Sequence, residues 1–117
     1  MARTRITSGV ISDEFQSSHT LSGTSIDIDW NEAQVFTLTP SGNTTFTFSD
    51  FKIGMVKILV VTGSGGSPAR TLSFPTEANK LAGDYDDTSN TKNFIQIVCT
   101  SHTGDGEFFY TISQPAS

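Results

Sequence analysis

The feature that most constrains this chain is a strict alternation of apolar and polar side chains that begins at residue 25. In residues 25–30, an apolar side chain occupies every second position from Ile26 to Trp30. Because successive side chains of a β-strand point to opposite faces of a sheet, this pattern predicts a strand with one buried face. Residues 34–39 and 44–49 repeat the pattern, so we expect a β-structure.

Turn residues separate the predicted strands. Residues 40–43 (Pro-Ser-Gly-Asn) favour a turn and predict a hairpin between residues 34–39 and 44–49. Residues 58–61 are continuously apolar, as in a central strand that is covered on both faces. Further strands are predicted at 69–74, 93–100 and 107–113, which makes about seven strands at intervals of about ten to twelve residues. The predicted fold class is all-β, an antiparallel β-sandwich for which a jelly roll is one fitting topology.

The chain of 117 residues has room for one domain, which we place at residues 23–117. Residues 1–22 differ, because they mix apolar residues with glycine, serine and threonine and lack regular alternation. Such a segment does not form a stable helix alone, which predicts an N-terminal arm that orders against a partner; a frayed terminus is the alternative. The apolar residues of this predicted docking or oligomerisation arm are Ile6, Val10, Ile11 and Phe15.

The charge of the chain excludes some classes of partner. The net charge is -5 and the seven Lys and Arg residues are scattered, whereas binding to nucleic-acid phosphates needs clustered basic residues. Residues 1–6 are not followed by the apolar stretch of a signal peptide, and the apolar run 58–61 is too short to span a bilayer. We therefore expect no nucleic-acid partner and no membrane insertion.

Candidate catalytic residues are few. Cys99 is the only cysteine and lies in an apolar run, where a thiol usually packs as a small apolar group, with His102 in a predicted turn nearby. Asp27 and Asp29 share one strand face roughly 6–7 Å apart, a spacing that suits glycosidase chemistry, but ordinary solvent-facing positions are the favoured explanation. The sequence has no Ser/His/Asp set and no metal-ligand spacing, so we predict no enzyme activity, no catalytic or metal-binding residue and no cofactor.

Residues 76–91 are the one long segment that we predict to be irregular. The segment combines Tyr85 with Asp and Asn side chains, residue types that can stack on sugars and hydrogen-bond to them. The acidic run 84–87 also suggests a calcium loop, but the spacing of an EF-hand is absent and a solvated acidic loop is favoured. The residues of the predicted glycan-contact loop are Asn79, Asp84, Tyr85 and Asp86.

Taken in order, these segments resemble a β-sandwich domain of tailed-bacteriophage virion proteins. The resemblance rests on a strand ending in Asp29-Trp30, a threonine-rich segment at 43–49, Gly54 before an apolar strand, the segment 70–75 ending in Phe-Pro, and a closing hairpin from 93–95 to 108–110. Residues 4–13 are similar to short segments that precede the globular parts of phage fibres. The chain departs from the pattern after Phe-Pro, where relatives often carry Trp and Gly-Gly and this chain has Leu81-Ala82-Gly83.

The resemblance implies a virion structural protein of the capsid decoration or head-fibre type, or a tail-fibre tip. Such domains are commonly homotrimers, and packing around a symmetry axis would bury an apolar arm that one chain cannot cover. The implied partners are capsid or tail proteins, and the implied location is the virion, after assembly in the host cytoplasm. The alternative is a carbohydrate-binding module that recognises a host-surface glycan through residues 76–91.

Overall fold

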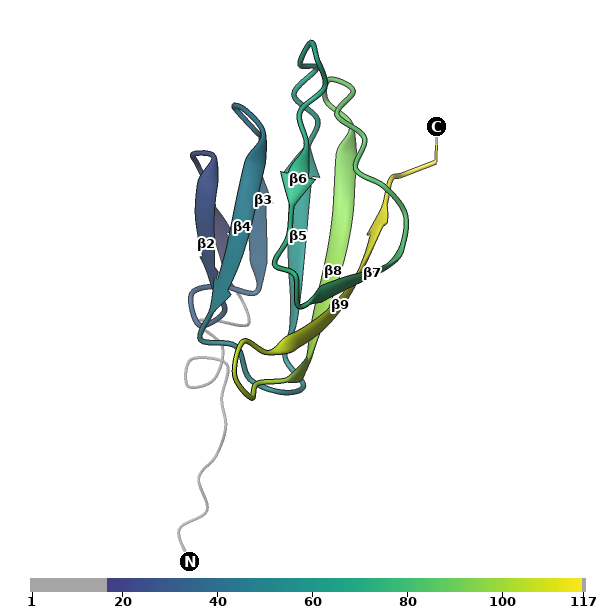
Figure 1. Ribbon diagram of the computed structural model, residues 1–117. Coiled ribbons are helices and arrows are strands. Elements are labelled where there is room, and N and C mark those ends of the chain that lie inside the picture. Colours follow the sequence, from purple (N-terminus) through teal and green to yellow (C-terminus); the bar gives the residue numbers. More distant parts are fainter. Residues whose placement is uncertain (1–16, 117) are drawn as a thin grey trace, which may run out of the picture.

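The computed structural model describes residues 17–116, which form nine strands and no helix. The strands make two sheets that pack together (Figure 1), so the predicted all-β class is confirmed. The six-stranded sheet has the order β1 (Ser18–Thr20), β3 (Val35–Leu38), β5 (Val56–Thr62), β8 (Lys92–Ser101), β9 (Glu107–Ser113), β7 (Ala78–Ala82). The three-stranded sheet has the order β2 (Ser25–Asp29), β4 (Thr44–Ser49), β6 (Leu72–Ser73).

The chain alternates between the two sheets over its first six strands. Strands β1, β3 and β5 enter the larger sheet and β2, β4 and β6 enter the smaller one, and each strand lies parallel to the strand two before it. Successive coils therefore stack on one another, as in a short solenoid. Among the described strands, the two antiparallel pairs both involve β8, which lies between β5 and β9.

The predicted hairpin between residues 34–39 and 44–49 is wrong, and so is the predicted antiparallel order of the first strands. Strands β3 and β4 lie in different sheets, and β4 pairs with β2 in parallel. The turn at residues 40–43 carries the chain across to the other sheet instead of back along the same one. Alternation reveals which side chains are buried, but it does not reveal the partner strand. The predicted closing hairpin is confirmed, because β8 and β9 pair in the antiparallel sense.

The core fills the space between the sheets with the side chains that alternation predicted to be buried. Ile26, Ile28 and Trp30 are 6%, 1% and 0% exposed. The ring centroids of Trp30 and Phe108 lie 5.3 Å apart, and those of Phe48 and Phe108 lie 4.8 Å apart. Each buried aromatic ring of this kind contributes about 1.5–3 kcal/mol, so the aromatic residues are a principal support of the fold.

Residues 18–21, which the sequence assigns to the arm, belong to the β domain. Strand β1 is an edge strand of the six-stranded sheet, and Leu21 is buried in the core, where its backbone N–H donates a 2.7 Å hydrogen bond to the carbonyl of Thr37. The domain therefore extends back at least to Ser18. The predicted arm residues Ile6, Val10, Ile11 and Phe15 lie outside the described residues. Within residues 17–116, no helix is long and apolar enough to cross a membrane.

Candidate functional site

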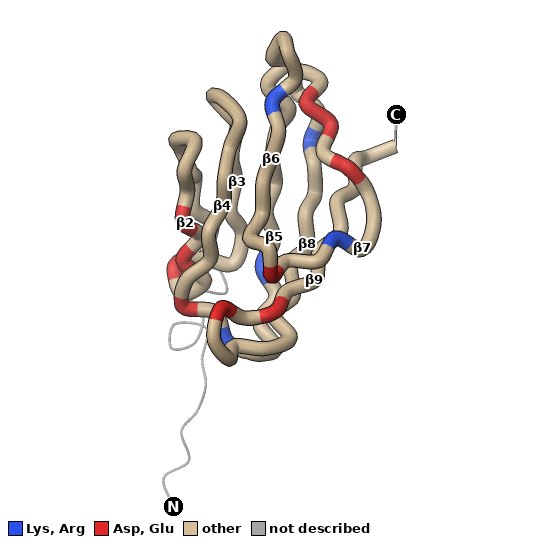
Figure 2. The backbone as a smooth tube through the Cα atoms, in the orientation of Figure 1, with Lys and Arg blue, Asp and Glu red and all other residues tan. Residues whose placement is uncertain are grey.

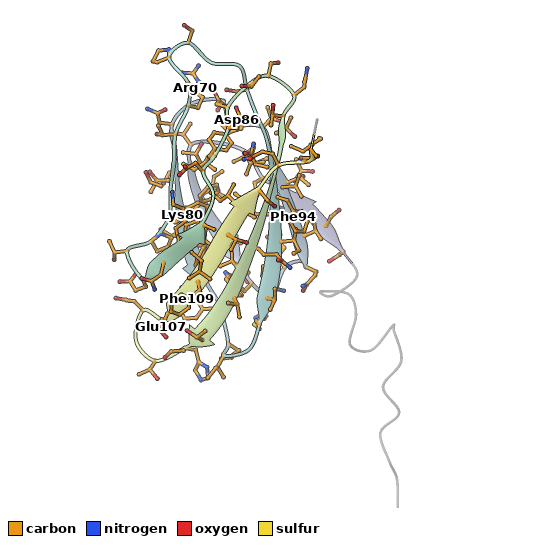
Figure 3. All side chains as sticks on the ribbon, turned by 90° about the vertical axis from the view of Figure 1, so that its right-hand side faces the viewer. Arg70, Lys80, Asp86, Phe94, Glu107 and Phe109 are labelled. Carbon is orange, nitrogen blue, oxygen red and sulfur yellow. The ribbon has the colours of Figure 1, made fainter. Side chains whose placement is uncertain are left out.

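One face of the six-stranded sheet points away from the smaller sheet and carries many apolar side chains. In β5, the side chains of Leu59 and Val61 are buried between the sheets, and the side chains that alternate with them point outward. Figure 3 views the molecule from the side of β7, β8 and β9, with Phe94 and Phe109 labelled. We define the outer face as Val35, Thr37, Val56, Ile58, Val60, Leu81, Phe94, Gln96, Val98, Phe109 and Thr111.

The register of the central strands gathers the apolar side chains of the outer face. Val56 of β5 lies opposite Val98 of β8, and Val98 lies opposite Phe109 of β9. The next row along the face places Ile58 opposite Gln96, and the row beyond it places Val60 opposite Phe94. Paired positions of this kind place their side chains in contact across the strands. The outer face is therefore continuous across at least three strands.

Charged residues stand only at the two ends of this face on β5, β8 and β9. Lys92 is the first residue of β8 and Glu107 is the first residue of β9, and these two strands run in opposite directions. Figure 2 shows no acidic or basic position along the middle of β8 and β9, and the Lys57 side chain of β5 is buried. Because charge is depleted at the centre of protein interfaces and common elsewhere on surfaces, this distribution favours an interaction surface.

A shallow groove of about 300 Å³ runs along the outer face. Its walls include Val56, Leu81 and Phe109. Leu81 is 65% exposed, and Phe94, elsewhere on the face, is 44% exposed. Leu81 has no partner in the register of β7 with β9, which shifts between Lys80 and Ala82, so a β-bulge presents its side chain at the groove. Exposed apolar side chains that are gathered in one place are typical of a binding surface.

The segment 76–91 differs from its prediction, because it is not wholly irregular. Residues 78–82 form β7, which pairs with β9 in parallel. Asn79 lies on this strand, and its side-chain amide donates a 3.0 Å hydrogen bond to the carbonyl of Phe108. Alternation did not reveal β7, because its sequence Ala-Asn-Lys-Leu-Ala has no period-two pattern.

The remaining predicted glycan-contact residues lie in the loop after β7. Asp84 accepts a hydrogen bond from Lys80, and Asp86 accepts one from the backbone N–H of Thr88 at 2.9 Å. The side chain of Thr88, and then this backbone N–H, lower the pKa of Asp86. Both carboxylates are exposed, whereas Tyr85 is half-buried and packs against the core. Glycan contact stays a prediction, and the side chains that this loop presents for it are those of Asp84 and Asp86.

Asp87 connects this loop to the loop between β5 and β6. Its carboxylate is 6% exposed and accepts hydrogen bonds from the backbone N–H groups of Ser64, Gly66 and Arg70 and from the hydroxyls of Ser64 and Tyr85. Burial raises the pKa of Asp87, but these hydrogen bonds outweigh burial and hold the pKa well below its usual range. The acidic run that suggested a calcium loop therefore contributes its last carboxylate, that of Asp87, to the scaffold.

The residues considered for catalysis are occupied in structural contacts. Cys99 is fully buried, and burial raises the pKa of its thiol, which is the opposite of what a nucleophile needs. His102 accepts a 2.9 Å hydrogen bond from the backbone N–H of Ile53 through Nδ1. Asp27 accepts hydrogen bonds from Thr47 at 2.9 Å and from Ser49 at 2.5 Å, along the surface of the three-stranded sheet. Across residues 17–116, no three His, Cys, Asp or Glu side chains are gathered to hold a metal ion.

Sequence analysis also failed to predict the burial of Lys57. Lys57 is 1% exposed and points into the core from β5, where its ammonium donates a 2.8 Å hydrogen bond to the carbonyl of Ala33 and lies 3.4 Å from Oε1 of Gln34. The alternation of the strand could have revealed this burial, because Lys57 lies two residues before the buried Leu59 and four before the buried Val61, and so on the same face. These contacts hold the connection between β2 and β3 against the core.

The three comparisons with known proteins give no match. No family model fits the chain, and neither a curated protein nor a solved structure is similar enough to count as a match. The function must therefore be argued from the residues and surfaces described above.

Proposed function

We propose that the chain is a non-enzymatic structural protein of a tailed-bacteriophage virion, of the capsid decoration or head-fibre type, which self-associates as a homotrimer. A tail-fibre tip is the alternative within the same class. The observation that carries the self-association is the outer face of the six-stranded sheet. The assignment to a virion is supported by the resemblance of the sequence to phage β-sandwich domains, and we class the two packed sheets as a coiled variant of that architecture.

The first argument is that both faces of the six-stranded sheet carry apolar side chains, and that only the inner face is covered by other described residues. The three-stranded sheet covers its inner face in the described part of the chain (Figure 1). Parallel strands such as β1, β3 and β5 usually occur in sheets that are covered on both sides. A second copy of the chain supplies a cover of matching chemistry, because threonine and β-branched side chains on flat strands pack well against one another.

The second argument is the placement of charge. Lys92 and Glu107 stand at opposite ends of the outer face and have opposite signs. A neighbouring copy can therefore bring its Glu107 toward Lys92 without placing a charge inside the interface. Complementary charges at the rim orient an association and have little effect on its strength, so the apolar residues would supply the affinity.

The experiment is the solution mass of the full-length chain by light scattering, for the wild type and for Phe94→Lys. We expect the wild type to have about three times the monomer mass of 12.6 kDa, and the variant to have the monomer mass, because an unpaired charge would be buried in the interface. The matched control is Ile53→Lys, which adds the same charge at a residue that is 60% exposed and is not part of the outer face.

Each outcome has a defined meaning. A monomeric wild type would overturn self-association through this face. A dimer would keep the interface and overturn the homotrimer. If Ile53→Lys dissociates the assembly as strongly as Phe94→Lys, the outer face is not the contact.

A further inference from the structure

A second pocket lies where β4 ends and β9 begins, and its lining shares no residue with the groove of the outer face. Its volume is about 320 Å³, and its walls are formed by Phe48, Phe51 and Phe108, with Pro75 beside them. The carboxyl-bearing residues Glu77 and Asp105 also line it. We call it the aromatic pocket. A volume of this size is at the lower end for ligand sites and suits a small head group.

The rings of the aromatic pocket have a defined arrangement. Phe48 and Phe51 each stand edge-on to Phe108, with centroids 4.8 Å away and interplanar angles of 75° and 80°. Gly106, at φ +84°, permits this arrangement, since a Cβ there would lie 2.6 Å from Cε1 of Phe51 and 2.9 Å from the ring of Phe108. A side chain at Gly106 would therefore displace the rings that form the pocket.

The charge of the lining selects the chemistry of a ligand. Glu77 is half-buried, and its Oε2 accepts a 2.9 Å hydrogen bond from the hydroxyl of Thr76, whereas Asp105 is exposed. No Lys or Arg is among the residues that line the pocket. Figure 2 shows several acidic positions along this end of the molecule. Carboxylates repel an anion and contribute nothing to a neutral apolar ligand, so the lining favours a cation.

Aromatic rings favour a particular kind of cation. A cation over an aromatic face gains about 0.5–2 kcal/mol, and the gain is greatest when the cation gives up little hydration. A quaternary ammonium group meets this condition, because it is large, weakly hydrated and has no hydrogen-bond donor. We propose that the aromatic pocket binds a quaternary ammonium group of the choline type, with the partly exposed rings of Phe48 and Phe51 against the methyl groups, the buried ring of Phe108 behind them as their support, and Glu77 and Asp105 near the charge.

The chain contains its own reporter for this binding. Trp30 is the only tryptophan, and its ring centroid lies 5.5 Å from that of Phe48, 6.5 Å from that of Phe51 and 5.3 Å from that of Phe108. A ligand that shifts these rings will change the environment of the indole. Intrinsic fluorescence therefore follows occupancy without a label.

The experiment titrates the full-length protein with choline and with 3,3-dimethyl-1-butanol, the neutral analogue in which carbon replaces nitrogen. We expect a saturable change in Trp30 fluorescence with choline, and binding of the neutral analogue that is at least about tenfold weaker, corresponding to about 1.4 kcal/mol. Ethanolamine forms a third arm, and we expect it to bind more weakly than choline because a primary ammonium group is more strongly hydrated.

Variants locate the binding. Glu77→Gln and Asp105→Asn should each weaken choline binding about threefold to tenfold, by removal of one nearby charge. Asp84→Asn is the matched control, because it makes the same change in net charge at an exposed residue that does not line the pocket, and it should leave binding unchanged. Circular dichroism of each variant checks that the fold is retained.

Three results would overturn the proposal. The first is the absence of a saturable change both in Trp30 fluorescence and in the backbone amide resonances of Gly104 and Asp105. The second is equal binding of choline and its neutral analogue, which would show that the pocket binds apolar groups and does not select for a positive charge. The third is equal weakening by Asp84→Asn and Glu77→Gln, which would indicate a general effect of net charge. Since the outer face is a separate surface, the mass of these variants in solution tests the proposed self-association independently.

Discussion

The hydroxyl of Tyr85 donates a 2.6 Å hydrogen bond to Oδ1 of Asp87, and the same oxygen accepts a hydrogen bond from the backbone N–H of Ser64 at 2.9 Å. Two loops that are distant in sequence are joined at this point. Close approach of the loops also requires Gly63, since a Cβ there would lie 2.0 Å from the carbonyl oxygen of Thr88. The buried carboxylate thus replaces the regular hydrogen bonds that strands would supply at this end of the domain.

Asp87→Asn should destabilise the protein by about 2–4 kcal/mol at pH 7, because a neutral amide accepts at one oxygen only and weakens several charge-assisted hydrogen bonds at once. Denaturation with urea measures the change. Asp84→Asn is the matched control at an exposed position and should alter stability by less than about 0.5 kcal/mol. Equal losses in the two variants would show that Asp87 has no special role in joining the loops.

The stability that Asp87 contributes should depend on pH in a defined direction. Its pKa is lower in the folded protein than in the unfolded chain, so the contribution is present in full above the unfolded pKa of about 3.9 and is lost as the pH falls toward the folded pKa. The difference in unfolding free energy between the wild type and Asp87→Asn should therefore be smaller at pH 3 than at pH 7, although part of it remains at pH 3 because the folded pKa lies well below its usual range. A constant difference between the two proteins would contradict this assignment.

Tyr85 should act at the other end of the pH scale. Burial, together with its hydrogen bond to Asp87, raises the pKa of Tyr85, so ionisation of the unfolded chain draws the protein toward unfolding as the pH rises above about 10. Tyr85→Phe removes this ionisable group, so the free energy of unfolding should depend less on pH between about 9 and 11. The variant also loses the hydrogen bond to Asp87 at neutral pH. Thermal unfolding monitored over this range checks the prediction. Equal alkaline slopes in the two proteins would contradict it.

The sequence predicted burial far better than it predicted pairing. Ile26, Ile28 and Trp30 are buried as their alternation requires, because the two faces of a strand differ in hydrophobicity whatever its partner is. The strand that pairs with β4 depends on the direction in which residues 40–43 turn the chain. Turn residues of this kind occur both in hairpins and in connections between two sheets. Strand β7 escaped prediction because its pairing with β9 is made by backbone groups of a segment without alternation.

The candidate surface was likewise hidden from sequence reasoning. Phe94 and Phe109 were assigned to strands, but their presence on an uncovered face follows only from the order of the strands in the sheet. The position of Leu81 at the groove depends on a β-bulge. This bulge follows from the register of β7 against β9 and has no simple signature in the sequence. Asp87 was identified as acidic, but its interior position depends on two loops that are brought together by tertiary structure.

The parallel coiling of the first strands can be tested by cross-linking. Ser25 and Thr45 are register partners in β2 and β4, so a double variant with cysteine at both positions should be linked within one chain by a short bifunctional thiol reagent. The matched control places cysteines at Thr37 and Thr47, which would be close neighbours in a hairpin but lie in different sheets. Efficient cross-linking of the control pair, with no cross-linking of residues 25 and 45, would support a hairpin between β3 and β4 and contradict the parallel pairing of β2 with β4.

Lys57 provides a test of how a buried charge is tolerated. Lys57→Met keeps most of the volume but leaves the carbonyl of Ala33 without this donor, and should destabilise the protein by about 1–3 kcal/mol. Lys57→Ala adds a cavity and should cost about 1–2 kcal/mol more. Urea denaturation of both variants gives the comparison. A variant with Met that is more stable than the wild type would show that desolvation of the ammonium outweighs its hydrogen bonds.

The predicted role of the N-terminal arm can be separated from folding by removal of residues 1–16. Every described strand remains in the shortened chain, so we expect its circular dichroism spectrum to retain the β signal of the full-length protein. If Ile6, Val10, Ile11 and Phe15 dock the protein, the shortened chain should no longer be incorporated into particles, as measured by sedimentation of virions assembled with either form. A second variant replaces the four apolar residues by serine. It keeps the length of the arm and should reduce incorporation as much as the deletion does, which separates the role of the apolar side chains from that of arm length. Incorporation of the shortened chain at the wild-type level would contradict a docking arm and would leave the outer face of the six-stranded sheet as the surface through which the protein assembles.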